Sequence, residues 1–306
     1  MLSPSIKLLF FCGISLVLPF SWAYALQPDL LHNVFMFENT LRRDGTFDEA
    51  KSIVYMSSGC TGFFVKNKNN KPYIMTARHC YNYNFTQQCQ KGLIYLYAIS
   101  EDHTPHIGRC QNIIASSALD DAVIFEAQFE KEFYPPLDSY SLAGTEAPTC
   151  SKAELIGFPA DPERQGRFTV SENCWTQPSD SLHAEYMFTD PDKEQEAIED
   201  TRKYWEENPD LLAQLTSLSI KPGYHNCSVY GGNSGGPLKL AGQKIAIGLP
   251  FQYLHVEGTL FSADAHTVYE SLDEFVNRHH STLKQHGISI VDQYKVETVK
   301  ECGINI

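Results

Sequence analysis

The chain has 306 residues, of which 42% are hydrophobic, and a formal net charge of −13. This acidic balance argues against nucleic acid as a partner, because the phosphate backbone would be repelled. About 280 residues follow the first 25, which is enough to bury a sizeable core as one large domain or two fused halves.

The first 25 residues have the pattern of a secretory signal peptide. Lys7 is their only charge, the stretch 8–20 is mostly apolar, and 23–25 is a small-x-small cleavage site. No later stretch approaches about 18 uninterrupted apolar residues. We therefore expect a secreted protein, extracellular or periplasmic, without membrane contact after signal removal.

Short β-like runs dominate the chain from 52 to 262. They are rich in Ile, Val, Tyr and Phe and are separated by the residues typical of turns. Many short strands without alternating helices favour a sandwich or barrel over a parallel α/β sheet. The clearest runs are 61–65, 73–76, 93–98, 122–127, 153–158 and 245–249.

Two segments have a helical pattern instead. The first, 190–219, overlaps an acidic stretch, 185–210, that contains ten Asp and Glu residues. It could be a lid or a partner surface, although a solvated decoration is the commonest role of a charge run. The second, 267–284, places apolar residues at i, i+4, i+7 and i+8 from Val268, which predicts a helix.

Eight of the nine cysteines follow the signal peptide. An even number in an exported chain favours disulfides over metal sites, and no Cys-x-x-Cys spacing argues otherwise. His103 and His106 could hold a metal, but a solvated loop is the favoured interpretation. We therefore expect no metal and no cofactor. The cysteines are Cys60, Cys80, Cys89, Cys110, Cys150, Cys174, Cys227 and Cys302.

Ser234 lies between two glycine pairs, in the stretch 231–236. Such glycines suit a tight loop, but they also suit a nucleophile held in a strained turn. A serine hydroxyl needs a neighbouring base, and the base needs a carboxylate that orients it. His79 follows one predicted strand and Asp120 precedes another, so these two residues can supply the base and the acid. Asp121 is the alternative acid, since neighbours on a strand point to opposite faces.

Four segments of the chain resemble the trypsin/chymotrypsin family of serine proteases. They read Ser-Gly-Cys-Thr-Gly-Phe-Phe-Val at 58–65, Thr-Ala-Arg-His-Cys at 76–80, Asp-Asp-Ala-Val-Ile at 120–124 and Gly-Asn-Ser-Gly-Gly-Pro at 232–237. Ile-Gly-Phe-Pro at 156–159 and Asn233 resemble the bacterial branch, which includes the glutamyl endopeptidases. The resemblance implies an all-β fold of two six-stranded antiparallel Greek-key barrels packed around a catalytic cleft. A helical acidic insertion and a C-terminal helix would be additions to it.

The resemblance also implies roles for individual residues. His79 would act as general base and acid, Asp120 would orient it, and Ser234 would attack a protein or peptide substrate. The backbone N–H groups of Gly232 and Ser234 would form the oxyanion hole. The expected activity is therefore hydrolysis of peptide bonds through an acyl-enzyme.

Two disulfides are expected from this resemblance and from the chain order. Cys60–Cys80 resembles the family bridge beside the histidine, and Cys174–Cys227 would close the excursion that contains the acidic insertion. The pairs Cys89–Cys110 and Cys150–Cys302 follow only by elimination.

Asn233 is a departure from the trypsin-like zymogens, which have an aspartate at this position. There the aspartate pairs with an α-amino group that activation sets free, and the pairing shapes the oxyanion hole. A neutral Asn233 cannot compensate a buried ammonium. We expect its amide to hydrogen-bond nearby backbone instead. Pro250 and Ser228, which are neutral and lie near the expected pocket, predict a neutral or apolar specificity.

Two other classes of protein remain open. A protease-fold binding protein without catalysis would usually lack a triad residue, and none is missing. An esterase of the α/β-hydrolase fold would need a helix directly after Ser234, which Pro237 opposes. The expected organisation is a signal peptide (1–25), an N-terminal segment (26–51), two barrels (52–145 and 146–264, with the helical insertion at about 180–222) and a C-terminal helix and tail (265–306).

Overall fold

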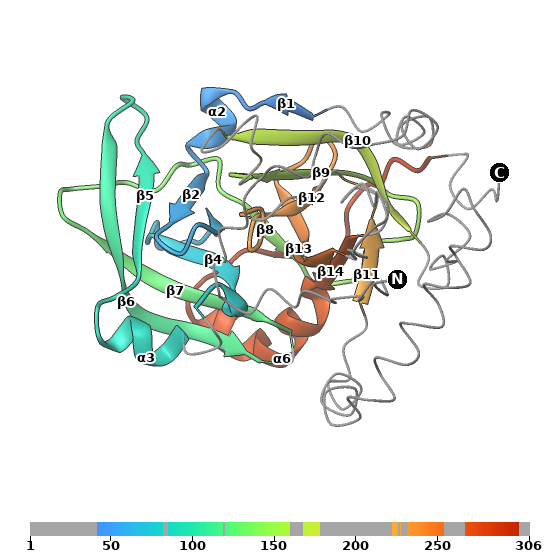
Figure 1. Cartoon of the computed structure of the whole chain (residues 1–306). Coiled ribbons are helices and arrows are strands. Elements are labelled where there is room, and N and C mark those ends of the chain that lie inside the picture. The colour runs from blue at the N-terminus through green and yellow to red at the C-terminus, as the bar shows by residue number, and fades with distance from the viewer. Residues whose placement is uncertain are drawn as a thin grey trace, which may run out of the picture.

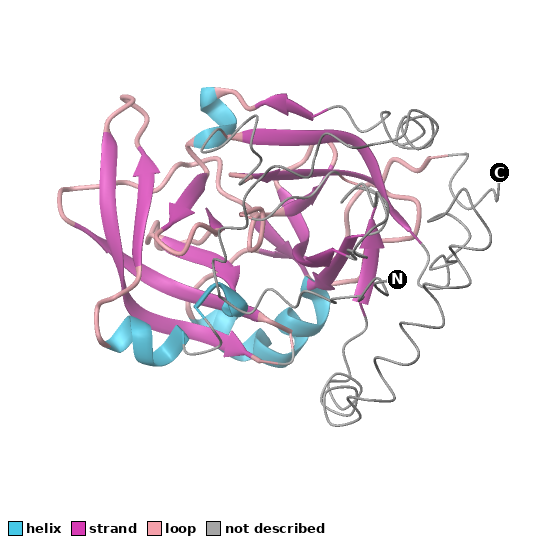
Figure 2. Ribbon diagram, viewed as in Figure 1, coloured by secondary structure: helices cyan, strands magenta, loops and turns pink. Residues whose placement is uncertain are grey.

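The computed structural model describes residues 42–81, 85–118, 120–159, 168–177, 222–225, 227, 232–253 and 267–299. Strands form most of this part, and the few helices lie outside the sheets (Figure 2). The predicted signal peptide (1–25) and the predicted helical segment 190–219 lie outside the described residues. Within these ranges, no helix has both the length and the apolar character that crossing a bilayer requires.

The first half of the described chain forms a closed barrel in the order β2-β3-β4-β7-β6-β5 (Figure 1). All of its pairings are antiparallel. Apolar side chains such as Val54, Phe64, Ile74 and Phe125 fill it. Its strands are β2 (Ile53–Met56), β3 (Thr61–Phe64), β4 (Tyr73–Ala77), β5 (Tyr95–Ile99), β6 (Pro105–Ser117) and β7 (Ala122–Phe129).

The second half contains another closed path of strands. It runs β12-β9-β10-β11-β14-β13 and returns to β12 through the β12–β13 pairing, so it has six strands. These are β9 (Lys152–Gly157), β10 (Thr169–Gln177), β11 (Pro222–His225), β12 (Leu238–Leu240), β13 (Ile245–Tyr253) and β14 (Thr267–Ser271). Three short strands, β1 (Arg42–Asp44), β8 (Ser141–Ala143) and β15 (Ile290–Val291), extend this sheet. The expected all-β fold of two six-stranded barrels is confirmed.

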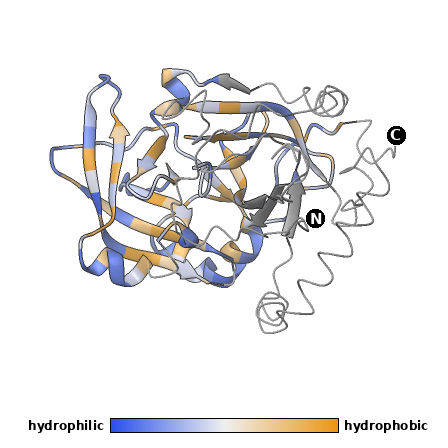
Figure 3. Ribbon diagram, viewed as in Figure 1, coloured by the Kyte–Doolittle hydropathy of each residue, from blue (hydrophilic) through white to orange (hydrophobic). Residues whose placement is uncertain are grey.

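Six of the fifteen strands in the described part of the chain, namely β3, β4, β5, β7, β9 and β13, overlap the predicted runs, and the longest strand of the first barrel, β6, does not. β6 spans thirteen residues, and Figure 3 shows hydrophilic and hydrophobic positions mixed along the barrel strands. Its pairing with β7 shifts register between Cys110 and Asn112 and again between Ile113 and Ala115. Each bulge adds a residue and breaks the alternation from which a strand is predicted.

The predicted helix 267–284 is correct only from Leu272 onward. Thr267–Ser271 is strand β14, which pairs with both β11 and β13. Helix α6 follows as Leu272–Gln285 and buries Leu272, Phe275, Val276 and Leu283. These side chains join one core cluster with Phe63 of the first barrel and Ile156 of the second. The C-terminal helix therefore packs where the two barrels meet. The remaining helices are α2 (Phe47–Ala50), α3 (Phe85–Gln90) and the 3₁₀ helix η2 (Arg78–Tyr81).

Disulfides join Cys60 to Cys80 and Cys174 to Cys227, as expected. A third joins Cys89 to Cys110, which confirms that pairing. Cys150 is also disulfide-bonded, whereas Cys302 lies outside the described residues. Disulfides persist in oxidising compartments, so they agree with a protein that functions outside the cytosol.

Candidate active site

His79 lies on η2, directly after β4 ends at Ala77. Its backbone N–H donates to Asp121 Oδ1 at 2.9 Å, and its ring Nδ1 contacts Asp121 Oδ2. Only 12% of the His79 side chain and 3% of the Asp121 side chain are exposed. The carboxylate thus holds the histidine by both backbone and ring, which fixes the direction of the imidazole.

The prediction that Asp120 orients His79 is wrong, and Asp121 takes that place. Asp121 adopts a left-handed backbone conformation with φ of 41° just before β7 begins, and its carbonyl accepts from Arg78 N–H at 2.8 Å. Aspartate tolerates this conformation better than most residues. The turn directs Asp121 to His79, while Asp120 contacts the other side: its carboxylate accepts from Arg278 of α6 at 3.0 and 3.4 Å.

The pKa of His79 reflects two opposing effects. Burial of the ring lowers the pKa, whereas the charge of Asp121 and the hydrogen bond to it raise the pKa. The net result is a pKa above the ordinary value of 6.5. An imidazole stabilised in this way accepts a proton more readily, which is what a general base requires.

The loop that carries Ser234 is packed tightly against the first barrel. Gly235 has a φ of 78°, and a Cβ there would lie 2.2 Å from Thr76 Oγ1 and 2.6 Å from the backbone nitrogen of Ala77. Only glycine permits this approach. The Ser234 carbonyl accepts from Thr61 N–H at 3.0 Å and lies 3.8 Å from the sulfur of Cys80, the residue after His79. The fold therefore brings Ser234 beside the histidine segment.

Gly232, the other expected oxyanion donor, has a φ of 95°. Its carbonyl accepts from the Thr61 hydroxyl at 2.7 Å. Between the two donors, the Asn233 carbonyl accepts from Gly236 N–H at 2.8 Å. The oxygen of the Asn233 side-chain amide does not hold this loop, because Asn233 Oδ1 is buried and has no hydrogen-bond partner among the described residues. Thr61 makes the contact instead, and sequence reasoning had given it no role.

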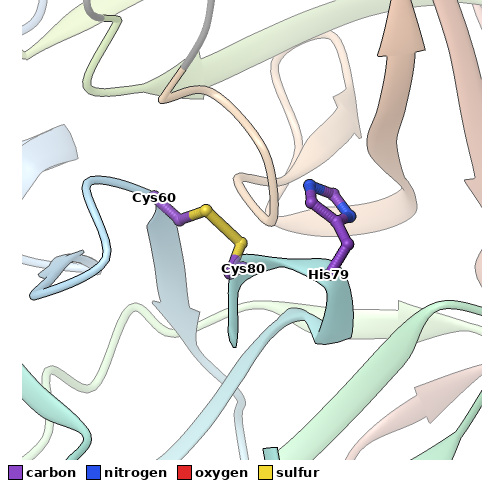
Figure 4. Close-up of side chains that lie close together, drawn as sticks. All are labelled: Cys60, His79 and Cys80. Atoms are coloured by element: carbon purple, nitrogen blue, oxygen red, sulfur yellow. A yellow bond between two sulfur atoms is a disulfide. The ribbon is translucent and has the colours of Figure 1, made fainter. Parts of the chain in front are cut away.

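Cys60, His79 and Cys80 are the one group in the described part of the chain whose ligand atoms cluster closely enough for a metal. Figure 4 shows, however, that the two sulfur atoms are bonded to each other beside the His79 ring. A disulfide offers no thiolate, and the thiolate is the form that binds metal. His103 stacks on Phe47, and His106 Nε2 lies 3.0 Å from Ser100 Oγ, so both belong to local side-chain packing.

The structure describes only one of the two residues on which the specificity prediction rests. Pro250 lies in β13 opposite Tyr269 of β14. Ser228 lies outside the described residues. The neutral or apolar preference therefore stays a prediction.

Searches for similar proteins give a match in structure only. No protein-family model matches the chain. No curated protein sequence matches it either. Among solved structures, human heparin binding protein matches with a TM-score of 0.53 and 11% identity, over 82% of this chain and 99% of that one. The Rv3671c protease, in a structure described as its inactive form, matches with a TM-score of 0.42 and 16% identity, over 78% and 90%.

The chain has the two-barrel fold of trypsin/chymotrypsin-like proteins. At 11% identity the match shows the fold alone. No match separates the glutamyl endopeptidase branch from other members with this fold, so that finer resemblance stays a prediction from the motifs at 156–159 and 232–237.

Proposed function

We propose that this chain is a secreted serine endopeptidase with His79, Asp121 and Ser234 as its catalytic triad. The observation that carries the proposal is the buried Asp121–His79 pair next to the glycine-bracketed loop of Ser234. A histidine held by a carboxylate and set beside a serine in a tight turn is the arrangement that activates a hydroxyl. The signal-peptide pattern and the three disulfides support export.

The proposed reaction proceeds in two halves. Ser234 Oγ attacks the scissile carbonyl carbon while His79 Nε2 takes the hydroxyl proton, and Asp121 stabilises the resulting imidazolium through Nδ1. The carbonyl oxygen becomes an oxyanion that accepts hydrogen bonds from Gly232 N–H and Ser234 N–H. The C–N bond then breaks, and His79 gives its proton to the leaving amine.

Water resolves the acyl-enzyme by the same chemistry in reverse order. His79 takes a proton from water, whose oxygen attacks the ester carbonyl at Ser234. The ester bond breaks, His79 returns the proton to Ser234 Oγ, and the acid product leaves. Every proton that His79 accepts is given back, so no cofactor enters the balance.

The raised pKa of His79 predicts the acid limb of the pH profile. Protonated His79 cannot act as a base, so kcat/KM should fall as the pH drops through a value above 6.5. Activity should be retained above that pH, where the imidazole is neutral. Steady-state hydrolysis of a peptide amide between about pH 5 and 9 measures this. An acid limb well below the ordinary histidine pKa would contradict the geometry of the Asp121–His79 pair.

The experiment that tests the proposed function compares two substrates on the purified mature protein. Cleavage of casein, with new peptide termini found by mass spectrometry, is the expected result. Hydrolysis of a short-chain ester without cleavage of casein would favour an esterase, and hydrolysis of neither would favour a silent binding protein. Labelling by a fluorophosphonate does not separate the first two classes, because both have an activated serine.

Binding of heparin by the structural neighbour does not transfer readily to this chain. Heparin is a polyanion, and the formal net charge here is −13. A net negative charge opposes association with a polyanion, most strongly at low ionic strength. The Asp121–His79 pair beside the Ser234 loop supports catalysis instead.

A further inference from the structure

We propose that the hydroxyl of Thr61 is a positioning group for the oxyanion hole, because it holds the peptide that links the two proposed donors. This inference rests on the proposed function. In trypsin-like enzymes an ion pair at the nucleophile's loop shapes the oxyanion hole. Here we assign that role to a residue of the first barrel. Thr61 itself touches neither the proposed nucleophile's hydroxyl nor the base in any contact described above.

Thr61 makes four hydrogen bonds and is completely buried. Its hydroxyl donates to the Gly232 carbonyl at 2.7 Å and accepts from Phe158 N–H at 3.0 Å. Its backbone N–H donates to the Ser234 carbonyl at 3.0 Å, and its own carbonyl accepts from the Thr76 hydroxyl at 2.7 Å. Two of these bonds, to the carbonyls of Gly232 and Ser234, hold the loop 232–234 against the first barrel.

The peptide between Gly232 and Asn233 matters because it lies between the two N–H groups. The Ser234 N–H belongs to the peptide 233–234, which the Gly236 N–H holds at the Asn233 carbonyl. The Gly232 N–H is joined to the next peptide only through the torsions of a glycine, which rotate at little steric cost. Fixing the carbonyl of Gly232 therefore fixes how the first donor is aimed relative to the second.

The side-chain oxygen of Asn233 does not provide this restraint. It is buried without a partner among the described residues, as noted above. A buried polar atom without a bond is unfavourable and offers no anchoring. The Thr61 hydroxyl is the side-chain group that anchors the Gly232 carbonyl.

The same hydroxyl also connects a third segment to the loop. Phe158 N–H donates to it, and the preceding residue is Gly157, where a Cβ would lie 2.9 Å from Thr61 Oγ1. The strand β9 can approach Thr61 this closely because position 157 has no side chain. One hydroxyl thus joins the end of β3, the end of β9 and the loop of Ser234.

The test replaces Thr61 by valine, which keeps the β-branched shape and removes the hydroxyl. We expect kcat to fall about 10²-fold, near the lower end of the effect of losing one oxyanion donor, with KM nearly unchanged. Affinity for a peptide aldehyde, which forms a tetrahedral adduct with the serine, should fall in parallel with kcat/KM. Affinity for the corresponding peptide alcohol should not change, because it has no carbonyl and forms no oxyanion. Thr61→Ser should restore most of the activity.

A matched control is available in the second barrel. The hydroxyl of Thr176 also donates to a carbonyl, that of Pro148 at 2.9 Å, and accepts from a backbone N–H, that of Ser151 at 3.0 Å. Neither Pro148 nor Ser151 belongs to the proposed active site. Thr176→Val should lower thermal stability to a similar extent as Thr61→Val without the fall in kcat.

The outcomes distinguish a failure of the positioning role from a failure of the proposed function. If wild type cleaves casein and Thr61→Val keeps kcat within about threefold, a value far below the loss of one donor, the positioning role is wrong and the proposed function stands. An equal loss of kcat in Thr176→Val, or weaker binding of the peptide alcohol in Thr61→Val, would also overturn it. If wild type does not cleave at all, the proposed function fails, and this inference fails with it.

Discussion

Ser234→Ala is expected to lower kcat for casein or a peptide amide by about 10⁶-fold, the scale seen when a triad nucleophile is removed. The change deletes the oxygen that forms the acyl-enzyme and leaves the backbone N–H groups in place. The loop should keep its shape, since its hydrogen bonds to Thr61 use the backbone of Gly232 and Ser234. Burst kinetics with an activated ester should disappear together with the turnover.

The control for this variant is a measurement of whether it folds like wild type. Circular dichroism and the thermal unfolding midpoint should match wild type, because only one partly buried oxygen is lost. Activity within tenfold of wild type, against an expected loss of about 10⁶, would show that another residue is the nucleophile.

Asp121→Asn is expected to lower kcat by about 10⁴-fold, as an amide in this position favours the wrong tautomer of the histidine. The carboxylate of Asp121 contacts His79 Nδ1, and an amide nitrogen there donates where the ring should donate. The same change removes the charge that raises the pKa of His79, so the acid limb of kcat/KM should move to lower pH.

Asp120→Asn is the matched comparison, because it makes the same chemical change one residue earlier. Asp120 pairs with Arg278 and does not hold the histidine. We expect it to lower stability, since it weakens a charge pair whose carboxylate is 4% exposed. Its effect on kcat should be far smaller than that of Asp121→Asn. A larger loss of kcat in Asp120→Asn than in Asp121→Asn would show that Asp120 orients the histidine.

Half of the twelve barrel strands could be predicted from the sequence, because they are short apolar runs between turn residues. β6 could not, since its two bulges interrupt the alternation that reveals a half-buried strand. Thr267–Ser271 was assigned to a helix because Val268 continues the apolar spacing of α6. Only the long-range pairing with β11 and β13, which is absent from any local window, makes it a strand.

In the candidate site, too, some residues can be found from a local motif and others only from contacts between distant parts of the chain. His79 and Ser234 stand in short motifs whose residue types are tied to their chemistry. The choice between Asp120 and Asp121 depends on a left-handed turn at one residue and on Arg278, which lies 158 positions away. Thr61 and Gly232 are 171 positions apart, and a contact between a hydroxyl and a main-chain carbonyl leaves no motif. The only signal in the sequence was a threonine directly after Cys60, in a segment that resembles the family.

The bond between Arg278 and Asp120 has a consequence for how the protein is made. Chains are synthesised from the N-terminus, so the first barrel emerges long before α6. Until α6 arrives, Asp120 has no cation to compensate its burial, and an unpaired carboxylate resists being buried. The first barrel of a nascent chain should therefore be less stable than the same barrel in the complete protein, because Asp120 gains its guanidinium partner only when α6 packs.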